Sequence, residues 1–192
     1  MQIQASIKCA DIDLHSIHGL VRSIKYPKDG AVRARKVISR SKTRGSGKYP
    51  SWKMKRMLHW ESPHELNAFR LLDANPAVLR FIEQPLTVRY VLDGVEHDHY
   101  PDIQVVTAAG KELWEVKTRE DAVSPEVARR TLLLAEALPS FGFTYRVATA
   151  EDLALQPRLS NLLFVLRHGR TDIPIVERER LRVLLTKLPD LT

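Results

Sequence analysis

The chain has 192 residues, of which 44% are hydrophobic, and this suffices for one domain with a substantial core. Its formal net charge is +7, and its single cysteine, Cys9, excludes an internal disulfide and a cysteine metal cluster. No apolar run approaches the roughly 18 residues of a membrane-spanning helix. The start of the chain also lacks the pattern of a signal peptide, so we expect a cytoplasmic protein.

The positive charge is concentrated near the N-terminus. Residues 28–56 contain eleven basic residues against one acidic residue, Asp29, and residues 39–49 contain almost no apolar side chain. We therefore expect residues 1–50 to form a basic arm that binds DNA phosphates with little sequence preference, with a solubilising linker as the alternative. The expected DNA-binding residues are Arg33, Arg35, Lys36, Arg40, Lys42, Arg44, Lys48, Lys53, Lys55 and Arg56.

Residues 52–75 have a helical period. Ser62, Pro63 and Glu65 together are a helix start signal, because Ser62 can cap the helix and Glu65 completes a capping box. We expect the helix to span residues 63–73. Glu65 also begins the apolar stripe of this helix, and a carboxylate at the edge of a core needs a partner. A metal site would provide one.

Residues 100–117 predict two alternating strands joined by a turn at residues 107–110. If the loop has two residues, Asp102 lies opposite Glu115; a register shifted by two residues puts it opposite Lys117. In both registers the three charged side chains share one face of the hairpin.

Like charges opposite each other destabilise a strand pair, so a cation is expected between Asp102 and Glu115. Two carboxylates and an ammonium suit a hard divalent cation, and Lys117 beside it can stabilise charge on a phosphate or help to activate water. The alternative is a set of solvated charges on the open face of an antiparallel hairpin.

The remaining pattern predicts an α/β protein. Strands are expected at residues 86–92, from residue 95 onward and at 143–148, and helices at 125–138 and 175–188, with Thr149 capping a short segment. In chain order this gives helix, three strands, helix, strand and helix, which is typical of a mixed sheet flanked by helices.

Three polar residues close to the hairpin in sequence also need an interpretation. Gln84 is a candidate for active-site support, and a hydrogen bond at a strand edge is its alternative role. We expect His97 and His99 to be exposed residues of a β-hairpin.

Pro101-Asp102 and Glu115-Val116-Lys117 match the PD-(D/E)xK signature, so the chain resembles the restriction-endonuclease-like nuclease superfamily. A closer resemblance covers residues 52–155 and concerns the TnsA-type endonuclease subunit of heteromeric transposases. The motifs that carry it are Ser62-Pro63-His64-Glu65, Leu72-Asp73-Ala74-Asn75-Pro76, Ile82-Glu83-Gln84-Pro85-Leu86, Tyr100-Pro101-Asp102 and Trp114-Glu115-Val116-Lys117.

The resemblance implies that Glu65, Asp102, Glu115 and Lys117 are catalytic. It implies that Asp102, Glu115, Glu65 and Val116 bind Mg²⁺, for which Mn²⁺ would substitute. The implied fold is a restriction-endonuclease-like core over residues 51–155. The implied activity is a Mg²⁺-dependent DNA endonuclease that nicks the 5′ ends of a mobile element in cut-and-paste transposition, with transposon-end DNA and a DDE-type transposase subunit as partners.

The chain departs from the longer TnsA-type proteins after Leu155. Those proteins continue with a winged-helix domain that contacts an ATPase regulator, whereas residues 156–192 predict only a short helical extension. The resemblance therefore implies an ATPase partner, but the short segment after Leu155 argues against one. Two other functions remain open: a stand-alone restriction- or resolvase-like nuclease of the same superfamily, and a non-catalytic DNA-binding module.

Overall fold

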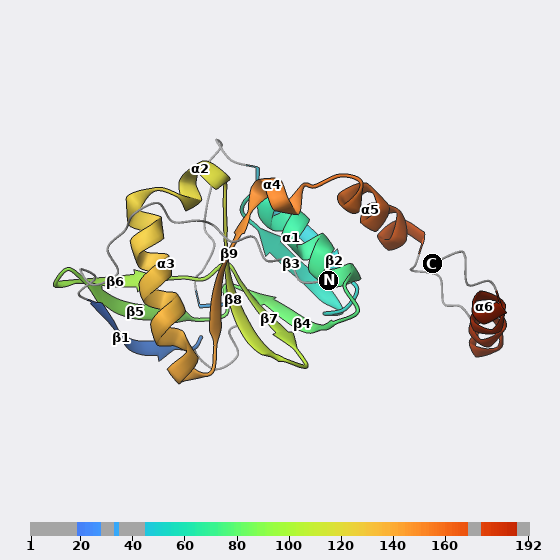
Figure 1. The fold of residues 1–192 in the computed structure, drawn as a ribbon, viewed down its shortest axis with the longest axis horizontal. Coiled ribbons are helices and arrows are strands. Elements are labelled where there is room, and N and C mark those ends of the chain that lie inside the picture. The colour runs from blue at the N-terminus through green and yellow to red at the C-terminus, as the bar shows by residue number, and fades with distance from the viewer. Residues whose placement is uncertain (1–18, 28–32, 35–44, 169–173, 188–192) are drawn as a thin grey trace.

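The computed structural model describes residues 19–27, 33–34, 45–168 and 174–187 (Figure 1). The protein is mixed α/β, with sheets flanked by helices. The strands are β1 (Gly19–Lys25), β2 (Gly47–Ser51), β3 (Arg56–Trp60), β4 (Val78–Glu83), β5 (Thr87–Leu92), β6 (Val95–His99), β7 (Ile103–Thr107), β8 (Gly110–Lys117) and β9 (Thr144–Thr149). The helices are α1 (Pro63–Ala74), α2 (Arg119–Ala122), α3 (Pro125–Ala137), the 3-10 helix η2 (Leu138–Phe141), α4 (Ala150–Leu153), α5 (Arg158–His168) and α6 (Ile175–Lys187).

A four-stranded sheet in the order β4-β7-β8-β9 forms the centre of the fold. β7 pairs antiparallel with β4 and with β8, whereas β9 runs parallel to β8. Two cores lie on the two faces of this sheet. Phe69 of α1 packs with Ile103 and Val116 in one core, and Leu134 of α3 packs with Leu113 in the other. Alternation along β8 sends Leu113 and Val116 to opposite faces, so α1 and α3 cover different faces.

The expected order of strands needs a correction. β5 and β6 do form the hairpin that the sequence predicts, but they pair with β1 in a separate sheet of order β1-β5-β6. The central sheet instead gains β4, a strand that the sequence pattern did not identify. The boundary expected at residue 50 falls within β2, and β1 lies inside the expected arm.

The predicted helix at residues 63–73 is confirmed as α1. The Ser62 hydroxyl accepts a hydrogen bond from the backbone N–H of Glu65, and Pro63 occupies the first turn, where its missing N–H costs nothing. The predicted helices at residues 125–138 and 175–188 are confirmed as α3 and α6, and Thr149 caps α4 through Asp152. Side-chain caps thus mark the starts of α1 and α4.

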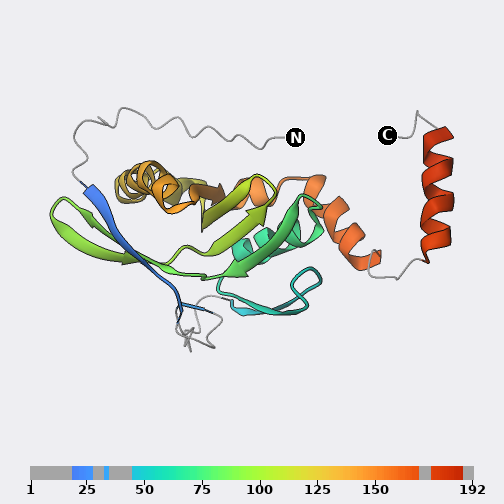
Figure 2. The same cartoon turned by 90° about the horizontal axis from the view of Figure 1, so that it is seen from below.

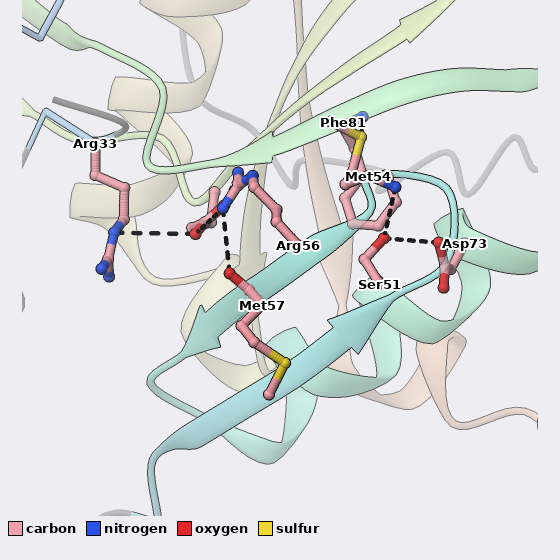
Figure 3. Close-up of polar contacts among 8 residues, drawn as sticks. Arg33, Ser51, Met54, Arg56, Met57, Asp73 and Phe81 are labelled. Carbon is pink, nitrogen blue, oxygen red and sulfur yellow. Dashed lines mark hydrogen bonds and ion pairs between the residues drawn. The ribbon is translucent and has the colours of Figure 1, made fainter. Parts of the chain in front are cut away.

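The β2–β3 hairpin replaces the first part of the helical pattern expected at residues 52–75. It lies on the side of the central sheet opposite α3 (Figure 2). Asp73, near the end of α1, fixes the hairpin turn by accepting hydrogen bonds from Ser51 Oγ (2.8 Å), Trp52 N (2.8 Å) and Lys53 N (2.8 Å), and Figure 3 shows the contact with Ser51. The hydroxyl of Tyr49 donates a fourth bond at 2.9 Å.

None of the described helices is long and apolar enough to cross a membrane.

Candidate active site

Asp102 lies directly before β7, where Pro101 can occupy a position that makes no ladder hydrogen bond. β7 and β8 pair with Ile103 opposite Trp114, which is the first of the two predicted registers and brings Asp102 beside Glu115. The Asp102 carboxylate accepts a hydrogen bond from the backbone N–H of Val116 at 2.7 Å. The carboxylate is thus held across the hairpin at the end of both strands.

Glu115 is 4% exposed and is surrounded by nitrogen atoms. Its Oε1 lies 2.9 Å from Lys117 Nζ and 3.3 Å from Arg130 Nη2 of α3. Its Oε2 lies 3.2 Å from His99 Nε2, but the orientation there does not make a hydrogen bond, and this oxygen is buried without a hydrogen-bond partner among the described residues. One oxygen of Glu115 is therefore shared by two cations, and the other is buried without a hydrogen-bond donor among the described residues.

Lys117 completes the charged end of β8. Burial acts to lower the pKa of Lys117, but the charges of Glu115 and Asp102 outweigh it and the pKa is raised. The ammonium therefore stays protonated at neutral pH beside two carboxylates. Its side chain is 32% exposed, which leaves it accessible from solvent.

Glu65 reaches the same region from α1. Its carboxylate accepts hydrogen bonds from Glu61 N at 2.9 Å and from Ser62 Oγ at 3.0 Å, so it also stabilises the helix start. Burial raises the pKa of Glu65, while the hydrogen bonds from Glu61 and Ser62 and, to a smaller extent, the charge of Lys117 act to lower it. The capping role and the place beside the charged strands are therefore compatible.

The pKa of Asp102 is raised well above its usual range. Burial of the carboxyl group is the first cause, although the residue as a whole is only half-buried, and the negative charges of Glu115 and Glu65 follow. The hydrogen bond from Val116 and the charge of Lys117 act in the opposite direction. Three mutually repelling carboxylates thus meet near one lysine, and the site has excess negative charge that a cation would relieve.

The structure brings together all four expected catalytic residues, but not as a finished metal cage. Among the described residues no three His, Cys, Asp or Glu side chains are arranged to hold an ion. The residues nevertheless carry carboxylate oxygens, which are the ligands that Mg²⁺ prefers, and Oε2 of Glu115 has no hydrogen-bond donor among the described residues. A cavity of about 910 Å³ lies elsewhere, along β9, and its lining does not include these four residues.

Gln84 contacts the backbone of Asp102 in the candidate site. Its N–H donates to the carbonyl of Asp102 at 2.8 Å, and its own carbonyl accepts from Ala34 N at 2.9 Å. Gln84 has a φ of 44°, in the left-handed region that is uncommon for a residue with a side chain. Its Oε1 is buried without a hydrogen-bond partner within the described residues. The expected hydrogen bond at a strand edge corresponds to the backbone bond between Gln84 and Asp102. The expected support of the site stays a prediction, for which the side chain has an unused acceptor.

Two residues around Glu115 were missed by sequence reasoning. His99 was expected to be exposed, but it is 8% exposed, lies 3.0 Å from Tyr145 Oη, and burial lowers its pKa to about 4. The expectation was wrong because His99, at the end of β6, lies against Tyr145 and Glu115 of the neighbouring sheet. His97 is exposed and stacks on the ring of Tyr90.

Arg130 is the second missed residue. It lies three residues after Val127 and four before Leu134, both of which are buried, so the period of α3 already placed it on the apolar face. A basic residue at such a position requires an acidic partner, and Glu115 is that partner.

The expected DNA-binding residues divide into four groups. Arg33 and Arg56 approach the buried carboxylate of Glu83, with Arg56 making two hydrogen bonds to it (Figure 3). Lys53 donates to the carbonyls of Leu72 and Asn75 at the end of α1, which is a structural contact. Lys48 and Lys55 are exposed. The expected residues Arg35, Lys36, Arg40, Lys42 and Arg44 lie outside the described residues.

The chain matches no known family model, and a comparison with curated proteins finds no match either.

Proposed function

We propose that the chain is a Mg²⁺-dependent DNA endonuclease with a restriction-endonuclease-like core, acting as the nicking subunit of a transposase. The observation that carries the proposal is the meeting of Asp102, Glu115 and Lys117 at one end of the β7–β8 hairpin, with Glu65 beside them. Carboxylates that repel one another destabilise the folded state, and a bound divalent cation would neutralise this repulsion.

Each residue has a role that follows from its surroundings. Asp102 and Glu115, supported by Glu65 and the backbone of Val116, would hold the ion. Bound Mg²⁺ supplies a hydroxide nucleophile at neutral pH and stabilises negative charge on the phosphate. Lys117 stays protonated and adds positive charge beside the cleaved phosphodiester. The backbone bond from Val116 keeps the Asp102 carboxylate oriented while the ion and the DNA enter.

The choice of DNA rests on the excess of basic residues before residue 57. The choice of a transposase subunit rests on the resemblance of the motifs between residues 62 and 117 to TnsA-type endonucleases. In this role the chain would nick the 5′ ends of a mobile element, and a separate DDE-type transposase would cut and join the 3′ ends.

A strand-specific nicking assay tests the proposal. The substrate is end-labelled duplex DNA carrying the ends of the mobile element encoded with this chain, and the reactions contain Mg²⁺ or chelator, with and without the DDE-type transposase. We expect 5′-end nicks that require both Mg²⁺ and the transposase. Strong cleavage by the isolated chain would favour a stand-alone nuclease of the same superfamily. Absence of cleavage under every condition would leave a DNA-binding module.

A further inference from the structure

β9 lies at one edge of the central sheet, opposite the edge formed by β4. Within the part of the chain that the structure describes, it pairs only with β8, in an unbroken parallel register. An edge strand presents every second N–H and C=O group to whatever lies beside it. Many edges are blocked by a proline, a lysine or a bulge, but Thr144–Thr149 has none of these, and its one charged side chain, Arg146, lies over the ring of Trp114. β9 can therefore pair with a further strand.

The cavity of about 910 Å³ runs along this edge. It is lined by every residue of β9, by Trp114, which packs against the core under α1, and by Ala128 and Leu132 of α3. Since α1 and α3 cover opposite faces of the sheet, a cavity that reaches both faces passes around the edge of β9. α3 and α4 contact β9 and form the walls on its two sides (Figure 1). The cavity is therefore a slot beside the strand, which we call the β9 slot.

The two walls of the β9 slot differ in polarity. The wall on the α1 side has four charged side chains, Glu112, Arg146, Asp152 and Arg158, whereas the lining on the α3 side has none. The two acids balance the two arginines, and Glu112 already accepts a hydrogen bond from Trp114 Nε1 at 2.7 Å. The slot thus has no surplus positive charge for a nucleic acid, and it fits a strand with one apolar and one polar face.

Residues 2–8 of the chain have the sequence pattern of such a strand, although they lie outside the described residues. Apolar residues occupy every second position and polar residues the positions between them, with Ile3, Ala5 and Ile7 on one face and Gln4, Ser6 and Lys8 on the other. Residues 1–18 contain one lysine and two aspartates, so the surplus of basic residues begins only after them. This segment therefore suits a protein surface better than a phosphate backbone.

The chain tethers this segment within reach of the β9 slot. It joins the described structure at Gly19, where a β-carbon would come within 2.9 Å of Leu133 Cδ2 on α3. Leu132, the neighbour of Leu133, lines the slot. Residues 9–18 span up to about 33 Å when extended, and a helix such as α3 is only about 10–12 Å across. A segment tethered in this way has an effective concentration in the millimolar range.

We propose that residues 2–8 of this chain bind in the β9 slot as an added strand. Ile3, Ala5 and Ile7 pack toward α3, and the polar side chains between them face the charged wall. Main-chain hydrogen bonds to β9 hold the segment, and the alternating side chains select its register. The bound segment covers the edge of the central sheet, so that this edge no longer pairs with other chains.

Amide hydrogen exchange, followed by mass spectrometry, tests this placement. Exchange of the β9 amides is compared between the wild-type chain and Ile3→Asp/Ile7→Asp, which puts two charges on the apolar face of the segment. Gln4→Asp/Ser6→Asp is the matched control, because it adds the same two charges to the polar face. The amides of β4, at the other edge of the same sheet, report any general opening of the domain. The samples contain neither DNA nor Mg²⁺, so the result is independent of the proposed reaction.

We expect the β9 amides to exchange about tenfold faster in Ile3→Asp/Ile7→Asp, as for the loss of a segment whose effective concentration is about ten times its dissociation constant. Gln4→Asp/Ser6→Asp changes their exchange less than about twofold, and the β4 amides keep the wild-type rate in both variants. Equal rates for β9 in the two double variants would overturn the placement. So would an equal acceleration of β4 and β9, which indicates general opening.

A substitution in the wall tests the same contact from the other side. Leu132→Asp places a charge in the apolar wall, whereas Ala135→Asp places it at an exposed position of α3 that does not line the slot. We expect the β9 amides to exchange about tenfold faster in Leu132→Asp and at nearly the wild-type rate in Ala135→Asp. Equal β9 rates in these two variants would contradict the proposal.

Light scattering on the same samples distinguishes the other possible occupants. Protection of β9 that depends on Ile3 and Ile7 in a monomer supports binding within one chain. Protection that disappears as a dimer dissociates on dilution would assign the slot to a second copy. Protection that appears only after the DDE-type transposase is added would assign it to that partner. Either of the last two results would overturn the proposal.

Discussion

Asp73 and Asp102 are both enclosed carboxylates, and they differ in what surrounds the charge. Asp73 is 5% exposed and accepts four hydrogen bonds, two from hydroxyls and two from backbone N–H groups. Asp102 accepts one hydrogen bond among the described residues, from Val116, and faces the charges of Glu115 and Glu65. Asp73 therefore stabilises the fold, whereas Asp102 is held at a cost to the fold.

The difference separates an acid that stabilises the fold from the acids that we propose to be catalytic. A carboxylate that is fully hydrogen-bonded has no oxygen left for a metal ion or a substrate. The carboxylates near Lys117 keep unused acceptor capacity. Oε2 of Glu115, for example, has no hydrogen-bond donor among the described residues. Substitutions at the two places are therefore expected to separate, with loss of activity at one and loss of stability at the other.

The largest expected effect is on cleavage. Asp102→Ala and Lys117→Ala each reduce Mg²⁺-dependent nicking by about a thousandfold or more, because the first removes an ion ligand and the second a positive charge on the phosphate. Unfolding midpoints in urea and DNA affinity stay near those of the wild type. Asp98→Ala and Lys111→Ala are the matched controls and retain activity. Cleavage at the wild-type rate by either active-site variant would contradict the assignment.

The second effect is on stability. Asp73→Ala removes the acceptor of four hydrogen bonds, from the hydroxyls of Tyr49 and Ser51 and the backbone N–H groups of Trp52 and Lys53, and we expect a loss of about 3 to 5 kcal/mol in the free energy of unfolding. Urea denaturation measures it. Asp73→Asn retains one acceptor oxygen and costs less, which covers the case in which the alanine variant does not fold.

Asp102→Asn sharpens the comparison between the two acids. It removes a negative charge that repels Glu115 and Glu65, so the free energy of unfolding stays constant or increases. A greater loss of stability for Asp102→Asn than for Asp73→Asn would reverse the interpretation of the two sites.

A third effect is the response of stability to Mg²⁺. A ligand present at ten times its dissociation constant stabilises the folded state by about 1.4 kcal/mol, which raises the melting temperature of a chain of this size by about 3 to 6 °C. We expect this shift for the wild type and for Asp73→Asn, measured by differential scanning fluorimetry. Asp102→Ala loses it. An equal shift in all three proteins would mean that Mg²⁺ binds elsewhere.

The smallest expected effect on stability is that of replacing Asp98, a partly exposed acid. Asp98 of β6 is paired with Arg89 of β5 at 2.7 Å, and both side chains are partly exposed. The hydrogen bond from Arg89 lowers the pKa of Asp98, so the pair contributes stability above the ordinary pKa of aspartate and loses it as pH falls through the lowered value. Asp98→Asn therefore leaves the urea midpoint at pH 7 nearly unchanged, because water screens the pair. A large shift would show that exposure alone does not separate the acids.

Local signals in the sequence predicted a good part of the structure. Ser62, Pro63 and Glu65 fixed the start of α1, and the two-residue turn between β7 and β8 fixed the register that brings Asp102 beside Glu115. Both signals act over a few residues, through capping hydrogen bonds and the period of a strand. Asp102, Glu115 and Lys117 come together for this local reason, whereas Glu65 is brought to the hairpin by the packing of α1 against the sheet.

The missed features depend on contacts between distant residues. The turn between β2 and β3 ends at Lys55, with a φ of 53°, and it is stabilised by Asp73, about twenty residues away, rather than by a glycine or asparagine in the turn. β1 pairs with β5 across more than sixty residues, and Arg130 reaches Glu115 from another element. No local pattern of the chain encodes which of several possible partners each of these chooses.

β8 has a strand on each side, β7 and β9, and a hydrophobic core on each face, with Leu113 in one and Val116 in the other. Such a strand opens only when most of the domain opens. The backbone of β8 at Glu115 is therefore rigid. In the proposed reaction, adjustment to an entering ion or phosphate would be made by rotation of long, flexible side chains such as Lys117, while the backbone keeps its position.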